Sequence, residues 1–308
     1  MLLSPEIIHS SLAKSSLIEQ SGLDIVILDE VASSNDWALA QCKRGRVLPF
    51  VCFAEKQTGG RGRRGKQWLQ SPGANIAMSL AMPCVFEREV IAHLPLAVAL
   101  SVVFALEEMG VKNCQIKWPN DVLVAGEKIA GILIETVPLS KDKHADSGNH
   151  HETNEADWAA IIGIGVNYDM SALADDYLRN VAWTDLVSVF SLSNTAQMLA
   201  TGEPMQRKEP VLKRSEVAAI LLKNCLEICL LYPDNIPALR ARFEEKYDYC
   251  RGKQVELLLD NGKTLQGLAT GLTANAELLV QIEGVEQVFH SADVSVRPVV
   301  TTTRDVDE

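Results

Sequence analysis

An uncharged, apolar run from Leu94 to Leu106 constrains the fold more than any other feature of this sequence. It is too short to span a bilayer, which needs about 20 apolar residues. Glu89 precedes it, and Glu107 and Glu108 follow it directly. An element that is apolar on every side has to be enclosed by other elements. The sequence therefore predicts a buried helix over residues 89–109, a large core around it and no membrane span.

Composition narrows the class of protein. The chain has 308 residues, enough for one large domain with a small one or for two medium ones. Its 47% hydrophobic and 22% charged residues are ordinary for a soluble globular protein. A net charge of −11 argues against a nucleic-acid scaffold, which usually needs a basic surface. A soluble acidic enzyme or binding protein is expected.

Cysteine usage and the N-terminus bear on location. The seven cysteines are dispersed and form no C-x-x-C pair, which is typical of reduced thiols in a reducing compartment. Cys225 and Cys229 stand one helical turn apart in an apolar run, which favours core packing over metal binding. The first twenty residues lack the apolar core of a signal peptide. The cytoplasm is therefore the expected location.

The order of predicted elements indicates an α+β domain. Ser33, Ser34 and Asn35 are N-cap candidates for a helix that begins near Asp36. Residues 125–128 are expected to form a tight turn between two strands. Strands are predicted at 23–28, 50–55, 74–82, 115–118, 122–125, 129–136 and 158–166, and further helices at 215–231 and 236–247. Residues 1–22 are expected to form an arm or a short helix.

The sequence changes character near Tyr249. Asn261-Gly262 between two β-type runs predicts a hairpin with a type I′ turn. Short strands at this spacing predict a small β-barrel, followed by a frayed tail after Pro298. The polar segments 140–157, with three histidines, and 201–214 are interpreted as solvated loops rather than metal sites.

Two familiar phosphate-binding patterns occur in residues 59–68 by coincidence. Gly60, Gly62 and Gly65 satisfy G-x-G-x-x-G, and residues 60–66 satisfy G-x-x-x-x-G-K. Both patterns need a helix that starts at the loop. Here Trp68 leads into a Ser-Pro-Gly sequence that breaks helices, and Gln67 stands where a P-loop has Ser or Thr. Dinucleotide-binding and P-loop readings are therefore weak.

The same loop still points to anion binding. Three arginines and a lysine fall within residues 61–66, separated by glycines. Glycines let a backbone close over a ligand, and guanidinium groups match phosphate oxygens. A mobile loop of this kind suits a triphosphate. A basic surface loop, including one for nucleic acid, is the alternative that the loop alone leaves open.

Four segments together identify a family. The loop is followed by Lys117-Trp118-Pro119-Asn120-Asp121, by Lys128-Ile129-Ala130-Gly131-Ile132, and by Gly163-Ile164-Gly165-Val166-Asn167. With the GRGRRG loop, these closely resemble the hallmarks of the bacterial biotin–protein ligases, in the same order. The resemblance runs from about residue 23 to residue 297.

The resemblance implies a two-domain architecture. It predicts a catalytic domain over residues 23–249, with the mixed sheet and helices of class II aminoacyl-tRNA synthetases. It also predicts an SH3-like β-barrel over residues 250–300 and a tail at 301–308. Regulatory members carry an N-terminal helix-turn-helix of several dozen residues. Only about 22 residues precede the catalytic domain here, so no sequence-specific DNA binding is expected.

The resemblance also implies a biotin pocket. It assigns the ureido ring of biotin to Ser33, Ser34 and Gln57, helped by the backbone of Gly60 and Arg61. Asn35 and Gly131 are expected in the same pocket. Ser34 stands where Thr is commoner, which keeps the hydroxyl and loses a methyl group. The alternative is that Ser33 or Asn35 merely caps a helix, although both roles can coexist.

The remaining site residues are assigned to ATP. Arg63 matches the arginine that holds the adenylate phosphate, and Lys128 the lysine that reaches the biotin carboxylate and the α-phosphate. Asp121 is interpreted as a base or a carboxylate linked to magnesium. Further nucleotide contacts are predicted at Arg64, Trp68, Lys117, Asn120 and Asn167, although a lone Trp after a loop is more often part of the core. Mg²⁺ is expected with ATP and no protein-only metal site. Lys66 stands where the family often has Arg, which puts a bidentate contact there in doubt.

The implied activity has two steps. ATP converts biotin to biotinyl-5′-AMP with release of pyrophosphate, and a lysine of a biotin carboxyl carrier protein then takes the biotin. Residues 59–66 are expected to act as a lid against hydrolysis. The alternatives are a lipoate ligase, a transcriptional corepressor and an inactive binding protein. A monomer and a homodimer are both compatible with the sequence.

Overall fold

The structure is a computed structural model that describes residues 2–13, 19–86, 88–139, 156–171, 173, 182–192, 212–291 and 294–299. Most of the two predicted polar loops, with His144, His150 and His151, lies outside the described residues. The tail predicted at 301–308 lies outside them too.

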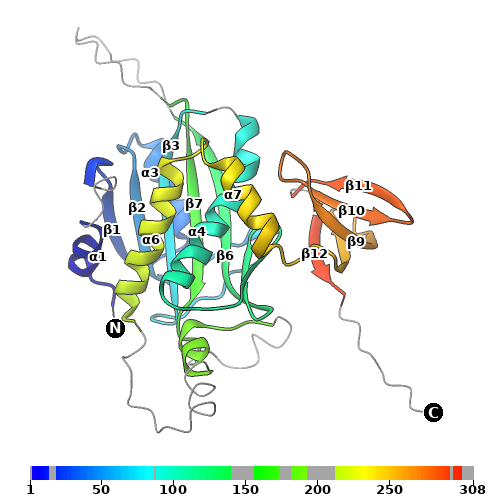
Figure 1. The fold of residues 1–308 in the computed structure, drawn as a ribbon. Coiled ribbons are helices and arrows are strands. Elements are labelled where there is room, and N and C mark those ends of the chain that lie inside the picture. Colours follow the sequence, from blue (N-terminus) through cyan, green and yellow to red (C-terminus); the bar gives the residue numbers. More distant parts are fainter. Residues whose placement is uncertain are drawn as a thin grey trace.

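A seven-stranded sheet forms the framework of the larger domain (Figure 1). The strand order is β1-β2-β3-β7-β6-β5-β4, with β1 parallel to β2 and every other pair antiparallel. The strands are β1 (Asp24–Val31), β2 (Phe50–Gln57), β3 (Asn75–Cys84), β4 (Cys114–Lys117), β5 (Asp121–Val124), β6 (Glu127–Pro138) and β7 (Trp158–Asn167). The predicted combination of a mixed sheet with helices is confirmed.

Helices cover both faces of this sheet. Successive side chains of a strand point to opposite faces. In β2, Val51 and Phe53 belong to the main core, whereas Phe50 and Cys52 pack with residues of α3 (Ser34–Lys43) on the other face. The main core lies under α4 (Leu94–Glu108) and α6 (Arg214–Leu230), and α7 (Ile236–Arg242) contacts α4.

The central apolar helix is confirmed as α4, preceded by the helical turn η2 (Arg88–His93). Residues 90–108 are long and apolar enough to cross a membrane, with a mean hydropathy of 2.1. Most of this segment is nevertheless buried inside the domain, as in the core helix of a soluble protein. Cys225 of α6 is fully buried in the same core, as predicted.

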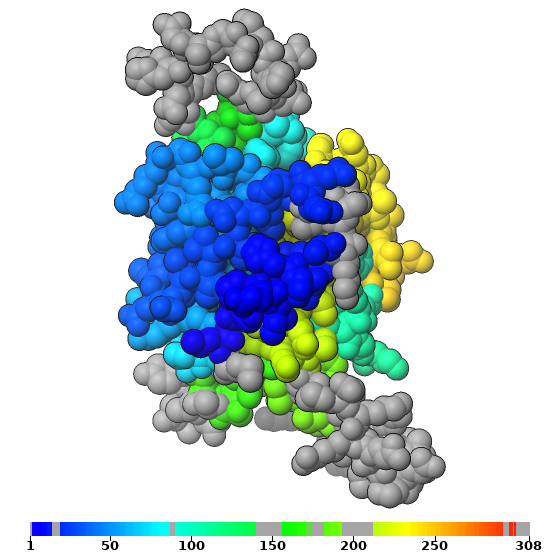
Figure 2. Space-filling view, turned by 90° about the vertical axis from the view of Figure 1, so that its left-hand side faces the viewer, coloured from blue at the N-terminus to red at the C-terminus, as the bar shows by residue number. Residues whose placement is uncertain are grey.

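The N-terminal segment folds back onto the large domain. Helix α1 (Pro5–Leu12) begins after Ser4, whose hydroxyl accepts the Ile7 N–H, and buries Ile8 and Leu12 against the core. Figure 2 shows this segment lying beside α6. Residues 5–12 therefore form a packed helix rather than a free arm.

Two tight turns differ in how well the sequence predicted them. Ala125 and Gly126 join β5 to β6 with φ of 52° and 85°, as a type I′ turn requires. The type I′ turn predicted at Asn261-Gly262 is wrong. Only Gly262 has a positive φ there, and the Gly262 N–H donates to the Leu259 carbonyl. That pattern is a type I turn followed by a glycine bulge, which makes the hairpin loop one residue longer.

The C-terminal domain is a five-stranded antiparallel sheet in the order β11-β10-β9-β8-β12 (Figure 1). Its strands are β8 (Gln254–Leu259), β9 (Thr264–Leu272), β10 (Leu278–Ile282), β11 (Val285–Phe289) and β12 (Val294–Pro298). Closure into an SH3-like barrel is a finer statement than this strand order and stays a prediction.

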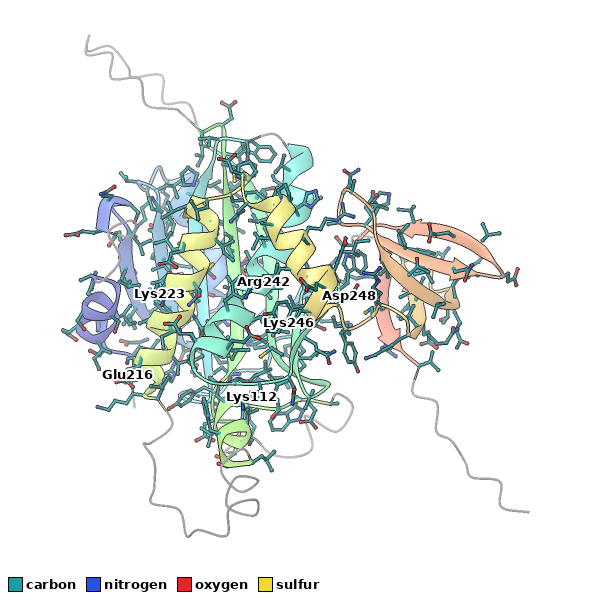
Figure 3. The ribbon with its side chains drawn as sticks, viewed as in Figure 1. Lys112, Glu216, Lys223, Arg242, Lys246 and Asp248 are labelled. Carbon is teal, nitrogen blue, oxygen red and sulfur yellow. The ribbon has the colours of Figure 1, made fainter. Side chains whose placement is uncertain are left out.

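The two domains meet directly after the last helix. Helix α7 continues through the wider turn η4 (Phe243–Tyr247) to Asp248, which lies between that helix and the C-terminal sheet (Figure 3). The Tyr249 N–H donates to the Ile116 carbonyl at 3.0 Å, and the Trp118 indole donates to the Ala276 carbonyl at 2.8 Å. These contacts place the C-terminal sheet beside the end of β4.

Candidate active site

A cavity of about 830 Å³ opens between the face of the sheet that carries α3 and the C-terminal domain. It is large enough for a ligand with several rings or phosphates. Every residue that the sequence predicted for the site lines it except Gly60, namely Ser33, Ser34, Asn35, Gln57, Arg61, Arg63, Arg64, Trp68, Lys117, Asn120, Asp121, Lys128, Gly131 and Asn167. The structure therefore brings the four sequence segments together in one place.

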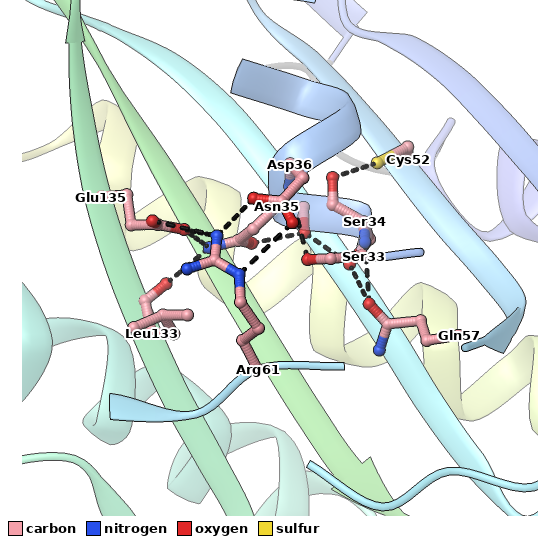
Figure 4. Close-up of polar contacts among 10 residues, drawn as sticks. Ser33, Ser34, Asn35, Asp36, Cys52, Gln57, Arg61, Leu133 and Glu135 are labelled. Atoms are coloured by element: carbon pink, nitrogen blue, oxygen red, sulfur yellow. Dashed lines mark hydrogen bonds and ion pairs between the residues drawn. The ribbon is translucent and has the colours of Figure 1, made fainter. Parts of the chain in front are cut away.

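One end of the cavity is neutral and is formed by the start of α3. Ser33 is the N-cap, and its hydroxyl accepts the Asp36 N–H at 3.4 Å. The Ser34 N–H donates to Gln57 Oε1 at 2.7 Å, and the Ser34 hydroxyl lies 3.1 Å from the same oxygen (Figure 4). Gln57 Nε2 in turn donates to Gln70 Oε1 at 2.9 Å. We call this the serine end of the cavity.

Asn35 is held against the sheet from three sides. Its amide nitrogen donates to the Leu133 carbonyl at 3.3 Å and to Glu135 Oε2 at 2.9 Å (Figure 4). Its amide oxygen lies 2.6 Å from the hydroxyl of Ser79 on β3. A Cβ at Gly163 would collide with this amide, so glycine is required for the close approach of α3 to β7.

Ser79 is a residue that the sequence analysis missed. It lies in the middle of the apolar strand β3 and is fully buried. Its only sequence signal is a hydroxyl among apolar neighbours, which does not by itself indicate a partner or a site. Asp36 and Glu135, which both bind Arg61, were also missed. The ion pairs with Asp36 and Glu135 hold the Arg61 guanidinium beside Asn35, next to the serine end (Figure 4).

Trp68 packs on the sheet between the two ends of the cavity. Its indole lies over Gly131 and Gly165, which are register partners on β6 and β7. A Cβ at Gly165 would stand 2.5 Å from the indole ring, so the flat contact depends on the glycine. The Lys128 ammonium lies 5.6 Å from the ring centroid, within cation–π range. Gly60 shapes this region without lining the cavity, because its carbonyl accepts the Trp68 N–H at 2.9 Å.

The other end of the cavity is cationic and centres on Asp121. The Lys128 ammonium lies 2.5 Å from Asp121 Oδ1, and the Lys117 ammonium lies 3.0 Å from Oδ2. Burial alone would raise the pKa of Asp121, but the charges of Lys128 and Lys117 and their hydrogen bonds outweigh it. The pKa of this carboxyl therefore lies below its ordinary value. We call this the cationic end.

The loop arginines contact the C-terminal domain. Arg63 donates to the Ser291 carbonyl and, at 3.3 Å, to Asn120 Oδ1. Arg64 forms an ion pair with Asp260 and donates to the Leu258 carbonyl at 3.2 Å. No helix starts at the loop, which makes only the single turn η1 (Arg63–Gly65). The weakness of the dinucleotide and P-loop patterns is thus explained.

Lys66 adds charge to this end without a carboxylate of its own. Among the described residues no ion pair involves it. Burial is the largest cause that lowers the pKa of Lys66. The nearby charges of Arg297, Lys117 and Lys128 lower this pKa further, whereas Asp121 raises it. Lys117, Lys128, Lys66 and Arg63 thus bring four positive charges near the single carboxylate of Asp121, an arrangement that attracts a polyanion.

Two asparagines fix the backbone around Lys128. The Asn167 amide donates to the Lys128 carbonyl at 3.4 Å and to the Thr184 carbonyl at 3.0 Å, and accepts from Asn75 at 3.1 Å. Asn120 donates to the Ile132 carbonyl at 2.7 Å. Both amides therefore hold strands in place, and their predicted nucleotide contacts stay predictions.

A magnesium ion at this end would depend on its nucleotide. Within the described ranges, no three His, Cys, Asp or Glu side chains converge as metal ligands do. Both oxygens of Asp121 contact lysines. Since Mg²⁺ is commonly held by phosphates with only one or two carboxylates, this donor set fits an ion that arrives with a triphosphate.

Comparison with known proteins gives one family throughout. Residues 35–149 match the profile of the biotin/lipoate A/B protein ligase family, and residues 252–297 match the biotin protein ligase C-terminal domain. The chain is 26% identical over 298 residues to the bifunctional ligase/repressor BirA of Escherichia coli, covering 95% of this chain and 80% of that protein. It is also 26% identical to the biotin–[acetyl-CoA-carboxylase] ligase of Mycobacterium tuberculosis, covering 88% of each. A similar solved structure is the Aquifex aeolicus biotin protein ligase in complex with biotin and ATP, with a TM-score of 0.64, 26% identity, and coverage of 90% of this chain and 99% of that one.

Proposed function

The chain belongs to the biotin–protein ligase family, and on that premise we propose that it forms biotinyl-5′-AMP from biotin and ATP. It then transfers the biotin to a lysine of a biotin carboxyl carrier protein. One observation carries this proposal: a single cavity has a neutral, hydrogen-bonding end and a cationic end. Biotin with ATP needs that combination, because its ureido ring is neutral and polar while its carboxylate must meet a triphosphate.

The serine end would hold the ureido ring. The hydroxyls of Ser33 and Ser34 and the amide of Gln57 offer donors and acceptors within one short segment of the wall. Gly131 and Gly165 let the indole of Trp68 lie close on the sheet, where it would form an apolar wall beside the body of biotin. The biotin carboxylate would then point toward Lys128.

Adenylation would take place at the cationic end. A carboxylate oxygen attacks the α-phosphorus, the bond to pyrophosphate breaks, and negative charge builds on the phosphoryl oxygens. Lys128, Lys117 and Arg63 would stabilise that charge, which is the dominant form of catalysis in such transfers. Magnesium, when it arrives with ATP, supplies further positive charge to the phosphates.

We assign Asp121 a positioning role rather than that of a base. Its lowered pKa makes it a poor proton acceptor, and both of its oxygens contact lysines. It would hold Lys117 and Lys128 at the right spacing until the ligand carboxylate and phosphates replace it as their partners.

Transfer would follow when a carrier lysine reaches the anhydride. The amine attacks the biotinyl carbonyl and AMP leaves with the pair of electrons of the broken C–O bond. Water competes for the same carbonyl, so the site has to stay closed until then. Residues 59–66, together with the C-terminal domain that they contact, would cover it.

Pyrophosphate release tests the proposal. We expect release with biotin and ATP, little with lipoate and ATP, and biotin on a carrier lysine when a carrier protein is added. Pyrophosphate release with lipoate and ATP but not with biotin and ATP would favour a lipoate ligase. No release with either biotin or lipoate would contradict an adenylating enzyme. The expectations of no sequence-specific DNA binding and of a monomer or homodimer stay predictions.

A further inference from the structure

The buried hydroxyl of Ser79 has two polar neighbours but only one proton. Its Oγ lies 2.7 Å from the Ser34 hydroxyl and 2.6 Å from Asn35 Oδ1. Ser79 is fully buried, and Ser34 and Asn35 are about 5% exposed or less. In such a place each proton has to be assigned, because an unsatisfied polar group is costly.

The orientation of Asn35 decides where the Ser79 proton goes. The Asn35 amide nitrogen faces two acceptors, the Leu133 carbonyl and the Glu135 carboxylate. A flipped amide would set its oxygen against both of them. The Asn35 oxygen therefore faces Ser79 and can only accept, so the Ser79 proton is donated to Asn35.

Ser34 must then donate to Ser79. With its own proton committed, Ser79 can only accept from the Ser34 hydroxyl at 2.7 Å. The competing acceptor, Gln57 Oε1, is farther away at 3.1 Å and already accepts the Ser34 N–H. The lone pairs of the Ser34 hydroxyl are consequently free to face the cavity, which Ser34 lines.

We propose that Ser79 is a positioning residue that fixes the Ser34 hydroxyl as a hydrogen-bond acceptor for a ligand N–H. This proposal deepens the proposed function and rests on it. The Ser33 hydroxyl, which accepts from the Asp36 N–H, keeps its proton for a ligand carbonyl. An acceptor beside a donor matches the N–H and C=O of a cyclic urea. The pair would discriminate against a ring that offers an oxygen at the N–H position.

The test compares Ser79→Ala with wild type on two ligands. The first ligand is biotin. The second is a carbamate analogue of biotin, in which a ring oxygen replaces the ureido N–H that faces Ser34. Of the two possible carbamate isomers, it is the one that wild type binds less tightly. Without Ser79, only the longer contact with Gln57 Oε1 holds the Ser34 hydroxyl, which can then rotate toward a ligand acceptor. We expect biotin binding, measured by calorimetry, to weaken about tenfold, which corresponds to one lost buried hydrogen bond. Binding of the analogue should change by less than about twofold, since its ring oxygen can accept the freed Ser34 proton.

Ser101→Ala is the matched control. Ser101 is equally buried, and its hydroxyl donates to the Val98 carbonyl within α4, remote from the cavity. Its loss should leave both affinities unchanged. Ser79→Cys, which keeps the size and a weak donor, should give an intermediate loss and serves if Ser79→Ala folds poorly.

The outcomes separate this proposal from the function on which it rests. If Ser79→Ala weakens the binding of both ligands equally, Ser79 has a merely structural role and its assignment as a positioning residue is overturned. Unchanged biotin binding would overturn it too. Failure of the wild-type protein to bind biotin at all would instead overturn the proposed function.

Discussion

The serine end and the cationic end of the same cavity are built in different ways. At the serine end, the polar atoms of Ser34, Asn35 and Ser79 are buried and bonded to one another on strands and on the start of a helix. At the cationic end, Asp121 and its two lysines also lie on strands, but Arg63 and Arg64 come from a loop and contact the C-terminal domain. One end is fixed by the sheet alone, and the other depends also on contacts between a loop and a separate domain.

The difference concerns what a ligand has to displace. A neutral ring entering the serine end meets groups already oriented, so little reorganisation is needed. A triphosphate entering the cationic end has to replace Asp121 at Lys128 and Lys117, and the Ser291 carbonyl at Arg63. If biotin and ATP occupy these two ends as we propose, biotin binding is mainly preorganised, whereas ATP binding rearranges its site.

The largest expected effect tests the framework beneath the serine end. Glu55 precedes Gln57 on β2 and forms a buried ion pair with Arg214 at 2.5 Å, each side chain being 4% exposed. Glu55→Gln leaves a buried guanidinium without its carboxylate. We expect the free energy of unfolding in urea to fall by about 3–5 kcal/mol.

Its neighbour Lys56 provides the control. The pair of Lys56 with Glu30 at 2.7 Å is exposed, so Lys56→Met should cost less than about 1 kcal/mol. Similar losses for the two variants would contradict a framework that depends on the buried pair.

The next effect concerns the cationic end and catalysis. Lys128→Ala removes the ammonium that lies closest to Asp121 and should slow pyrophosphate release about 10²–10³-fold, as expected for the loss of one group that stabilises charge in the transition state. Circular dichroism should be unchanged. Lys112→Ala, at an exposed lysine that does not line the cavity (labelled in Figure 3), should keep full activity. Full turnover by Lys128→Ala would show that our role for this lysine is wrong.

The sequence predicted the elements of the fold because its signals there are local. Hydrophobic runs, the Ser33 cap and the Ala125-Gly126 turn each depend on residues close together in the chain. The turn at Asn261-Gly262 shows the limit of such signals. Asn-Gly fits both a two-residue turn and a three-residue turn with a glycine bulge, and the pairing of Leu259 with Lys263 decides between them.

The sequence predicted which residues line the cavity but not which residues are their hydrogen-bond and ion-pair partners. Family motifs placed Arg61, Arg64 and Asn35 in the cavity. Their partners Glu135, Asp260 and Ser79 lie 44 to 196 positions away in the chain. Such contacts follow from strand register and domain docking, which no local pattern encodes. The geometry of the cavity therefore had to come from the structure.

Asp121 gives a smaller effect, on the pH dependence of stability. A carboxyl whose pKa is lowered by folding stabilises the protein above its unfolded value of about 3.9, and this contribution is lost as the pH falls through the folded value. Asp121→Asn should therefore lower the unfolding temperature most near neutral pH. The difference from wild type should shrink in acid, in a series of melts from pH 7 to about pH 3. A constant difference over that range would contradict the ion pairs with Lys117 and Lys128.

The smallest effect tests whether the C-terminal domain holds the loop. Arg64 pairs with Asp260, whose side chain is 61% exposed, so the pair contributes at most about 1 kcal/mol and is weakened by salt. Asp260→Asn should speed trypsin cleavage within residues 61–66 of the ligand-free protein by about two- to fivefold at low salt. Glu283→Gln, at an exposed carboxylate in the same domain, should leave cleavage unchanged.

Varying the salt concentration distinguishes the loss of the Arg64–Asp260 ion pair from a general loosening of the domain. If the ion pair holds the loop, wild type in high salt should approach the cleavage rate of Asp260→Asn, and the variant itself should respond little. Equal cleavage of the two proteins at low salt would mean that Arg64 does not anchor the loop. The loop at the cationic end would then be mobile despite the contacts of Arg63 and Arg64 with the C-terminal domain. The two ends of the cavity would in that case differ even more in rigidity.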